Sequence, residues 1–414
     1  MKLINKNNIS YSCQLVSDLK FSDGQNITKD DIIYSINSFI NKSYYSKYFN
    51  NIKEFNFKKD TINFRLKKPD IFFTSEALKY LKIIKKIDTQ IIGTGPLKLI
   101  NHAEKIHLEP NIYFKTNNPN YKNKKIKYKK IFLHQTLDHN TRHLKFLNRE
   151  FDFLHNSLPE RTYYNLSQAK EFNFFRQKGS TLHYILFNYR QNIFTKELRE
   201  KLTTSIKKNE IVKSKKYGFA RVAHGILPPE NIFYFNNKIS INFNNQETIK
   251  KTSNSVIDLE ILTSTNKDYN SILKVIQSQW KAQKIKSHLK ILEWGTFFQK
   301  INSGNFQIYN LQWSNISSPN IIYRVFHSNF CPPGLNRGCY KNPRLDKLLD
   351  SARFAATKKQ SINFYKQSQE LISKEKVFIP LWFNDNLLIT QKNLVIDPKI
   401  SLNSWYPLIF SSKK

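Results

Sequence analysis

The stretch from residue 256 to residue 294 constrains the fold most strongly, because strand and helix patterns alternate there at close spacing. A strand-like run at Val256–Thr263 is followed by a helical pattern at Tyr269–Gln283 and by a second strand-like run at Lys290–Trp294. This order is typical of a sheet covered by helices, so we expect an α/β fold. A chain of 414 residues is too long for one compact core and predicts two or three lobes.

Helix starts are marked in two other places. Thr28 is a hydroxyl N-cap followed by Asp31, the arrangement of a capping box. Thr195 is a second N-cap, and the apolar spacing after it predicts one helix as far as about Lys208. Further helical patterns lie at Asn342–Ala356 and Lys359–Glu375, and further strand-like runs at His183–Tyr189 and Phe378–Phe383.

The chain is strongly basic. Lys and Arg total 67 and Asp and Glu total 31, which gives a formal net charge of +36 and suggests a nucleic acid or an anionic membrane as partner. Mutational bias is the alternative source, because Lys, Asn, Ile, Phe and Tyr, the residues of A/T-rich codons, are abundant throughout. The basic residues are dispersed apart from the tract Tyr121–Lys130, which we interpret as an exposed loop or hairpin edge. No specific nucleic-acid partner is predicted, and a selected polyanion partner stays open.

The chain has no run of 18 apolar residues, so no transmembrane helix is predicted. The start, MKLINKNNIS, has no apolar h-region, and we do not expect it to be a secretory signal.

Cys331 and Cys339 share the short loop CPPGLNRGC. A disulfide between them would indicate an oxidising compartment, and two free thiols are the alternative. Cys13 stands alone and is expected to be a small buried hydrophobe.

Catalytic and metal-binding motifs are missing from the sequence. HExxH, CxxC, GxSxG, GxGxxG and GxxxxGK[ST] do not occur, so we predict no enzyme, no metal site and no cofactor. The turn Gly93-Thr94-Gly95 could be mistaken for a phosphate loop. Pro96 removes a donor N–H from it, and a structural role is the simpler interpretation.

The segment LKFSDGQNITKDDIIYS at Leu19–Ser35 resembles the family 5 extracellular solute-binding proteins, which include oligopeptide, dipeptide and nickel binders. Further blocks resemble this family in the family's own order and span nearly the whole chain. They are Phe64–Pro69, Gly93–Pro96, Asn118–Tyr121, Thr141–Asp152, Leu186–Asn188, Leu198–Ile211, Leu227–Pro229, Tyr340–Leu349 and Ile379–Leu381.

This resemblance implies the peptide-binding branch of the type II periplasmic-binding-protein fold, with two lobes, mixed sheets and a hinge. We expect residues 1–184 to form an N-terminally incomplete domain I, residues 185–387 domain II, and residues 388–414 to return to domain I. The implied function is that of the substrate-binding component of an ABC importer. Such a periplasmic monomer captures a peptide or related small solute and delivers it to permease subunits in the inner membrane.

The resemblance also implies a ligand site. In peptide-binding relatives the ligand adds as a strand beside the segment that here reads Tyr309–Trp313. A ligand carboxylate could pair with Arg337, although a solvated loop arginine is the alternative. For Trp313 and Trp382, the alternative interpretation is that they are ordinary core aromatics. The implied ligand-binding residues are Asn310, Leu311, Gln312, Trp313, Asn188, Tyr189, Trp382, Asn384 and Arg337.

Two departures from the family pattern keep other hypotheses open. Family members carry a signal peptide and several dozen further residues before the Phe-x-Asp-Gly block, and we expect these to be lost or to lie upstream. Peptide binders of the family have an Asp three residues after the Trp, where this chain has Ile316. A buried ammonium without a carboxylate would be costly. A polyanion- or envelope-binding protein on the same fold and a decayed receptor are the alternatives.

Overall fold

The computed structural model describes residues 1–414 except 1, 7, 16–17, 43–45, 47–48, 88–89, 103–104, 117–123, 237–256, 398–400, 404–405 and 414. The block Asn118–Tyr121 and the start of the tract Tyr121–Lys130 therefore lie outside the described residues.

The largest sheet is mixed, as the sequence predicts. The strands described in it run in the order β10-β16-β11-β15-β13-β14, and β12 pairs with β16. β13 runs parallel to β14 and β15, and the other pairs are antiparallel. The bounds are β10 Phe153–His155, β11 Phe172–Phe187, β12 Ala220–Val222, β13 Ile257–Ser264, β14 Ile285–Leu292, β15 Ile308–Trp313 and β16 Phe378–Gln391.

Helices cover both faces of this sheet because successive side chains of its central strands point to opposite faces. Tyr184 and Leu186 of β11 pack with α7, α8, α9 and α10, whereas Ile185 and Phe187 pack with α4, α5 and α6. We call the sheet with these helices the large body. The helices are α4 Lys196–Thr204, α5 Lys208–Lys215, α6 Lys267–Lys281, α7 Trp294–Ser303, α8 Asn320–Phe326, α9 Pro343–Arg353 and α10 Lys358–Lys374.

Several predicted bounds in the large body are wrong. The strand expected at His183–Tyr189 is the end of β11, which begins at Phe172, and the strand expected at Phe378–Phe383 is β16, which continues to Gln391. The helix from Thr195 to about Lys208 is divided into α4 and α5, because the backbone N–H of Lys207 donates to Oε1 of Gln279 on α6 at 3.1 Å. The strand predicted at Lys290–Trp294 is β14, which begins earlier and ends at Leu292. Glu293 then caps α7 by accepting from the backbone of Gly295 at 2.7 Å.

A smaller N-terminal body has its own core. Its sheet has the order β1-β2-β4-β3, with β1 Lys2–Lys6, β2 Ser10–Gln14, β3 Ile52–Lys58 and β4 Thr61–Leu66. Helix α1, Lys29–Lys42, begins with the predicted capping box: Thr28 N–H donates to Asp31 at 2.8 Å, and Asp31 N–H donates to Thr28 Oγ1 at 3.2 Å. The short π-helix η2, Thr74–Leu78, completes this body, and Cys13 is buried in its core.

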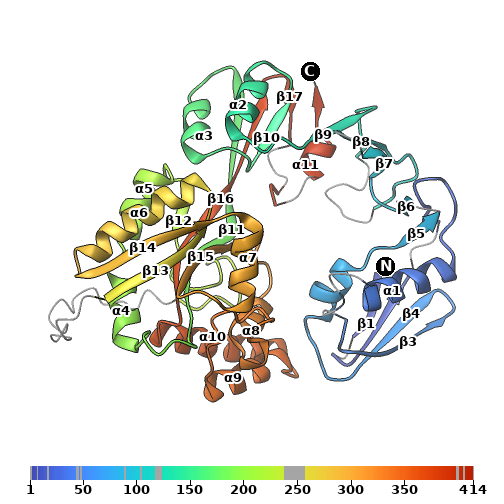
Figure 1. Ribbon diagram of the computed structural model, residues 1–414. Helices are drawn as coiled ribbons and strands as arrows, with labels where there is room; N and C mark the ends of the chain where they lie inside the picture. Colours follow the sequence, from blue (N-terminus) through green and yellow to red (C-terminus); the bar gives the residue numbers. More distant parts are fainter. Residues whose placement is uncertain are drawn as a thin grey trace.

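The remaining elements connect the two bodies (Figure 1). β5 Ile84–Ile87 and β6 Gln90–Gly93 pair with each other, and β7 Leu97–His102, β8 Lys105–Pro110 and β9 Ile131–His134 form another small sheet. A group at the top of Figure 1 contains α2 His139–Leu147, α3 Glu160–Ser167, α11 Tyr406–Ile409, β17 Leu394–Val395 and β18 Ser412–Lys413.

β11 and β16 run side by side from this group into the large body (Figure 1). The domain boundaries expected after residues 184 and 387 lie inside these two strands, and the division itself stays a prediction. A disulfide joins Cys331 to Cys339, just after the short 3₁₀ helix η4 Ser328–Phe330. No helix in the described parts of the chain has the length and apolar content required to cross a membrane.

Candidate ligand-binding site

A cleft of about 750 Å³ lies between the N-terminal body and the large body. This volume suits a small-molecule or short-peptide ligand, since such sites commonly enclose roughly 300–1,000 Å³. Its walls mix apolar, hydroxyl, amide and charged side chains from both bodies. The N-terminal body supplies Asn8, Ile71, Phe72, Thr74, Ser75 and Lys79, and the large body supplies Glu230, Asn231, Ile232, Phe233, Ser317, Ser318, Pro319 and Lys358.

A buried cluster of polar side chains joins the two bodies beside this cleft. Arg353 of α9 pairs with Asp70, with Nη2 2.8 Å from Oδ2, and its Nη1 lies 3.8 Å from Oε2 of Glu76. Ser318 and Asn320 of the large body both donate hydrogen bonds to the Glu76 carboxylate. We call Asp70, Glu76, Ser318, Asn320 and Arg353 the interbody cluster.

The interbody cluster is held away from water. The side chains of Asp70, Glu76 and Arg353 are 5%, 11% and 16% exposed. Burial raises the pKa of Asp70, and the charge of Arg353 opposes that rise. Burial also raises the pKa of Glu76, against the hydrogen bond from Ser318 and the charge of Arg353. Burial disfavours the ionised form of both carboxyl groups. The guanidinium and the polar hydrogen-bond donors are therefore needed to keep them charged.

The two tryptophans predicted to contact ligand are packed inside the large body. The ring of Trp313 is 9% exposed and stacks on Tyr184 with 3.7 Å between ring centroids. The ring of Trp382 is 1% exposed and stacks on His183 with 5.6 Å between centroids. This burial agrees with the alternative that they are core aromatics, and a contact of either ring with ligand stays a prediction.

Three other predicted residues make hydrogen bonds within the large body. Asn188 Nδ2 donates to the carbonyls of Gly304 at 3.0 Å and Phe306 at 2.6 Å. The hydroxyl of Tyr189 donates to the carbonyl of Val377 at 2.7 Å. Arg337 is 6% exposed, so it is not the solvated loop arginine of the alternative interpretation, and its Nε donates to Asn302 Oδ1 at 2.8 Å.

The strand predicted to align the ligand is β15. It pairs with β11 along its whole length, but with β13 only at Ile308 and Tyr309. The part of β15 after Tyr309 therefore has a strand neighbour on one side alone among the described residues. Side chains along it alternate, so Leu311 and Trp313 lie on the face opposite to Asn310 and Gln312.

The remaining predicted polar side chains, those of Asn310, Gln312 and Asn384, lie on one face of the sheet; Asn310 is buried and the other two are half-buried. Gln312 accepts a hydrogen bond from the Tyr269 hydroxyl at 3.1 Å, and Asn384 Nδ2 lies 2.9 Å from Nε2 of His183. The side-chain oxygens of Asn310 and Asn384 are buried and have no hydrogen-bond partner within the described part of the chain. None of the residues predicted to bind ligand is among those described as lining the 750 Å³ cleft.

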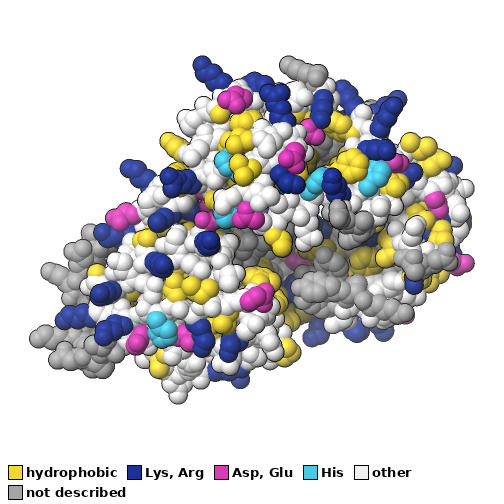
Figure 2. Space-filling model, turned by 45° about the horizontal axis from the view of Figure 1, so that its top comes forward, with side chains coloured by type: hydrophobic (Ala, Val, Ile, Leu, Met, Phe, Trp, Pro, Cys, Tyr) yellow, Lys and Arg dark blue, Asp and Glu magenta, His cyan; other side chains and the backbone are white. Residues whose placement is uncertain are grey.

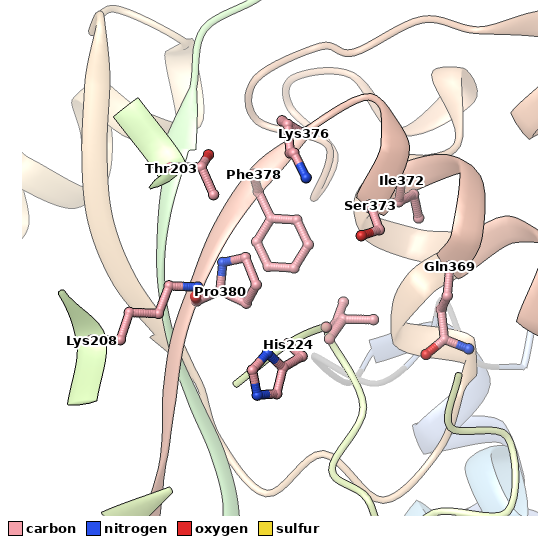
Figure 3. Close-up of a pocket in the computed structure, with 11 residues that line it drawn as sticks. Thr203, Lys208, His224, Gln369, Ile372, Ser373, Lys376, Phe378 and Pro380 are labelled. Carbon is pink, nitrogen blue, oxygen red and sulfur yellow. Dashed lines mark hydrogen bonds between the residues drawn. The ribbon is translucent and has the colours of Figure 1, made fainter. Parts of the chain in front are cut away.

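A second cavity, of about 40 Å³, lies inside the large body where α4, α5, α10 and β16 meet (Figure 3). It has room for little more than water. Lys208 extends its amine toward this cavity and donates to the carbonyls of Pro380 and Ala223. Burial lowers the pKa of Lys208 to about 7, and the nearby positive charge of Lys376 contributes.

Replacing Lys208 with methionine should flatten the pH dependence of stability. The unfolded chain holds the Lys208 proton up to a pKa of about 10.4, whereas the folded chain loses it near pH 7. The unfolded state therefore binds more protons between these values, and this group makes the free energy of unfolding rise with pH there. Urea unfolding should therefore show that Lys208→Met raises the free energy of unfolding, relative to the unsubstituted protein, more at pH 6 than at pH 9. Lys207→Met, at an exposed neighbour, should show no such difference.

Residues 3–329 match the family model described as bacterial extracellular solute-binding proteins, family 5 middle. The chain belongs to this family. The oligopeptide-binding protein AppA of Bacillus subtilis is 24% identical to this solute-binding protein over 93% of the present chain and 77% of AppA. The dipeptide-binding protein of Escherichia coli is 21% identical over 75% of the present chain and 62% of that relative.

Solved structures show the same fold. Bacillus subtilis AppA in complex with a nonapeptide has a TM-score of 0.79 and 22% identity, covering 100% of the present chain and 89% of AppA. NikA of Staphylococcus aureus in complex with Ni(L-His)2 has a TM-score of 0.79 and 17% identity, covering 97% of the present chain and 87% of NikA. This solute-binding protein therefore has the type II fold of the peptide- and nickel-binding proteins. Its described residues contain no group of three or more His, Cys, Asp or Glu placed to hold a metal ion.

Lys and Arg side chains are spread over the whole face drawn in Figure 2, with Asp, Glu and His between them. This distribution agrees with the dispersed charge of the sequence.

Proposed function

We propose that this family 5 protein captures a short peptide, or a solute of similar size, in the cleft between its N-terminal body and its large body. The observation that carries the proposal is the 750 Å³ cleft, whose walls come from both bodies. The names of its relatives, which are oligopeptide- and dipeptide-binding proteins, support the peptide class. The protein would act as a monomer in the periplasm, bind without chemical change of the ligand, and deliver it to ABC permease subunits in the inner membrane.

Capture would work by favouring one arrangement of the two bodies. A ligand that contacts both walls of the cleft binds better when they are close, and it therefore shifts the population toward the closed arrangement. The paired strands β11 and β16, which contain both expected domain boundaries, would serve as the hinge. Ser317, Ser318 and Pro319 follow shortly after β15, so an extended ligand could leave the cleft along the edge of that strand that faces away from β11, where no strand neighbour follows Tyr309 among the described residues.

A thermal-shift screen with a pool of short peptides, at low and at high salt, tests this function. Peptide at about 100 times its Kd should stabilise the folded protein by about 2.7 kcal/mol. The shift should persist at high salt, because the cleft and not the net charge holds the ligand. Ser317→Trp, which places an indole ring at the wall of the cleft, should reduce the shift, whereas Asn209→Trp at an exposed position of α5 should not. A shift seen with polyanions alone and removed by salt would contradict the proposal.

A further inference from the structure

The described wall of the cleft has more basic than acidic side chains. Its charged residues are Lys79 from the N-terminal body and Glu230 and Lys358 from the large body. The Glu230 carboxylate is already paired within the large body, since it lies 2.6 Å from Nη1 of Arg221 and 3.8 Å from Nζ of Lys178. Glu230 is therefore neutralised by its own neighbours and does not offset the two lysines of the wall.

Neither lysine of the wall has an acidic partner among the described residues. Both side chains are exposed, and neither amine lies within ion-pair distance of a described carboxylate. Lys358 is the first residue of α10, and the first turn of this helix contains no acidic residue. The amine of Lys79 has only a distant ring contact, 6.0 Å from the centroid of Tyr80. Each ammonium group is therefore available to an anion that enters the cleft.

The interbody cluster behind Ser318 does not reverse this balance. Its two carboxylates face one guanidinium, so it carries at most one negative charge in excess. The cleft wall together with the two partners of Glu230 has four positive charges and one negative charge. An excess of positive charge remains, and a cleft lined with charge of one sign attracts ions of the other sign.

Two hydroxyl groups of the wall supply further donors. The side chains of Thr74 and Ser317 line the cleft and make no hydrogen bond within the described part of the chain. A carboxylate accepts hydrogen bonds at about four positions, and those from charged donors are the stronger ones. Thr74 lies on the same body as Lys79, and Ser317 lies on the same body as Lys358. Each wall therefore offers one ammonium group and one hydroxyl group to a carboxylate.

We propose that the cleft prefers peptides with acidic side chains, whose carboxylates contact Lys79 on one wall and Lys358 on the other. This inference rests on the proposed function, since it requires a peptide in that cleft. Like charges on the two walls repel each other when the bodies approach, and an anionic ligand would remove that repulsion. Binding of an acidic peptide and closure of the cleft would therefore support each other.

Calorimetry with three pools of tetrapeptides tests the inference. The pools have the same free termini and differ only at the two central residues, which are both Glu, both Gln or both Lys. The Glu pool should bind about 3- to 10-fold more tightly than the Gln pool, the range for one or two partly exposed ion pairs. The double variant Lys79→Gln and Lys358→Gln should lose this preference. High salt should reduce the preference by screening, whereas the binding that the pools share should persist.

A charge reversal and a matched control make the result specific. Lys79→Glu with Lys358→Glu should invert the order, so that the Lys pool binds most tightly. Lys58→Gln with Lys359→Gln removes one exposed lysine from each body, outside the described lining of the cleft, and should keep the preference for Glu.

Three results would count against these assignments. Loss of the preference in the Lys58 and Lys359 control would assign it to the net charge of the protein and overturn the inference. Equal affinity of the Glu and Gln pools for the unsubstituted protein would also overturn it and leave the proposed function standing. Failure of all three pools to bind would refute peptide capture itself.

Discussion

Replacing Arg353 with methionine should destabilise the protein by about 3–5 kcal/mol, because it leaves two buried carboxylates without their counter-charge. The guanidinium lies 2.8 Å from Asp70 and 3.8 Å from Glu76, in a site where all three side chains are largely buried. Urea unfolding measures the loss. The deficit should be larger at pH 8 than at pH 5, since without Arg353 the carboxyl groups favour the protonated form in the folded state and lose that proton as the pH rises.

Two variants show whether buried charge is the cause. Arg65→Met breaks the ion pair between Arg65 and Glu54, whose side chains are 61% and 53% exposed, respectively. It should change the free energy of unfolding by about 1 kcal/mol or less. The triple variant Asp70→Asn, Glu76→Gln and Arg353→Met removes all three charges and should recover much of the loss. A loss for Arg353→Met no larger than that for Arg65→Met would mean that the interbody cluster does not hold the bodies together.

Trp313→Ala should lower the free energy of unfolding by about 3–5 kcal/mol, the usual range for removing a large buried aromatic side chain. Its ring stacks on Tyr184 and packs against Phe378 and Phe326, with centroids 5.6 Å and 6.2 Å away. The loss is expected without any ligand, because these contacts lie within the large body. Chemical unfolding of the ligand-free protein measures it.

Trp294→Ala is the matched control. This ring is 52% exposed at the start of α7, and its removal should cost about 1 kcal/mol or less. Equal losses for the two variants would contradict the packing described for Trp313. They would favour instead a role for that ring at the surface of the ligand site.

Local signals predicted the local structure well. The capping box at Thr28 and Asp31 and the N-cap at Thr195 are confirmed, because a cap depends on the side chain and the few backbone N–H groups next to it. The sequence could not show the interruption between α4 and α5. That interruption depends on a hydrogen bond from Lys207 to Gln279, which lies far along the chain on another helix.

Much less of the candidate site could be predicted from the sequence. At Ile316 the chain has no carboxylate for a ligand ammonium, and the structure buries this side chain. The Glu76 carboxylate comes from the opposite body and reaches Ser318, only two residues beyond Ile316. No spacing along the chain relates Glu76, Asp70 and Arg353, so no motif could have indicated them.

The family could be inferred from the sequence because blocks along nearly the whole chain resemble its motifs. The α/β class and the order of many elements could be predicted because they follow from periodicity, caps and turns within short segments. The tertiary structure was needed to show which side chains of β11 and β15 lie in the core and which polar groups of the two bodies contact one another beside the cleft. Those contacts join residues hundreds of positions apart, as Asp70 and Arg353 show. Their energies depend on burial, and burial is a property of the packed molecule that a linear pattern does not contain.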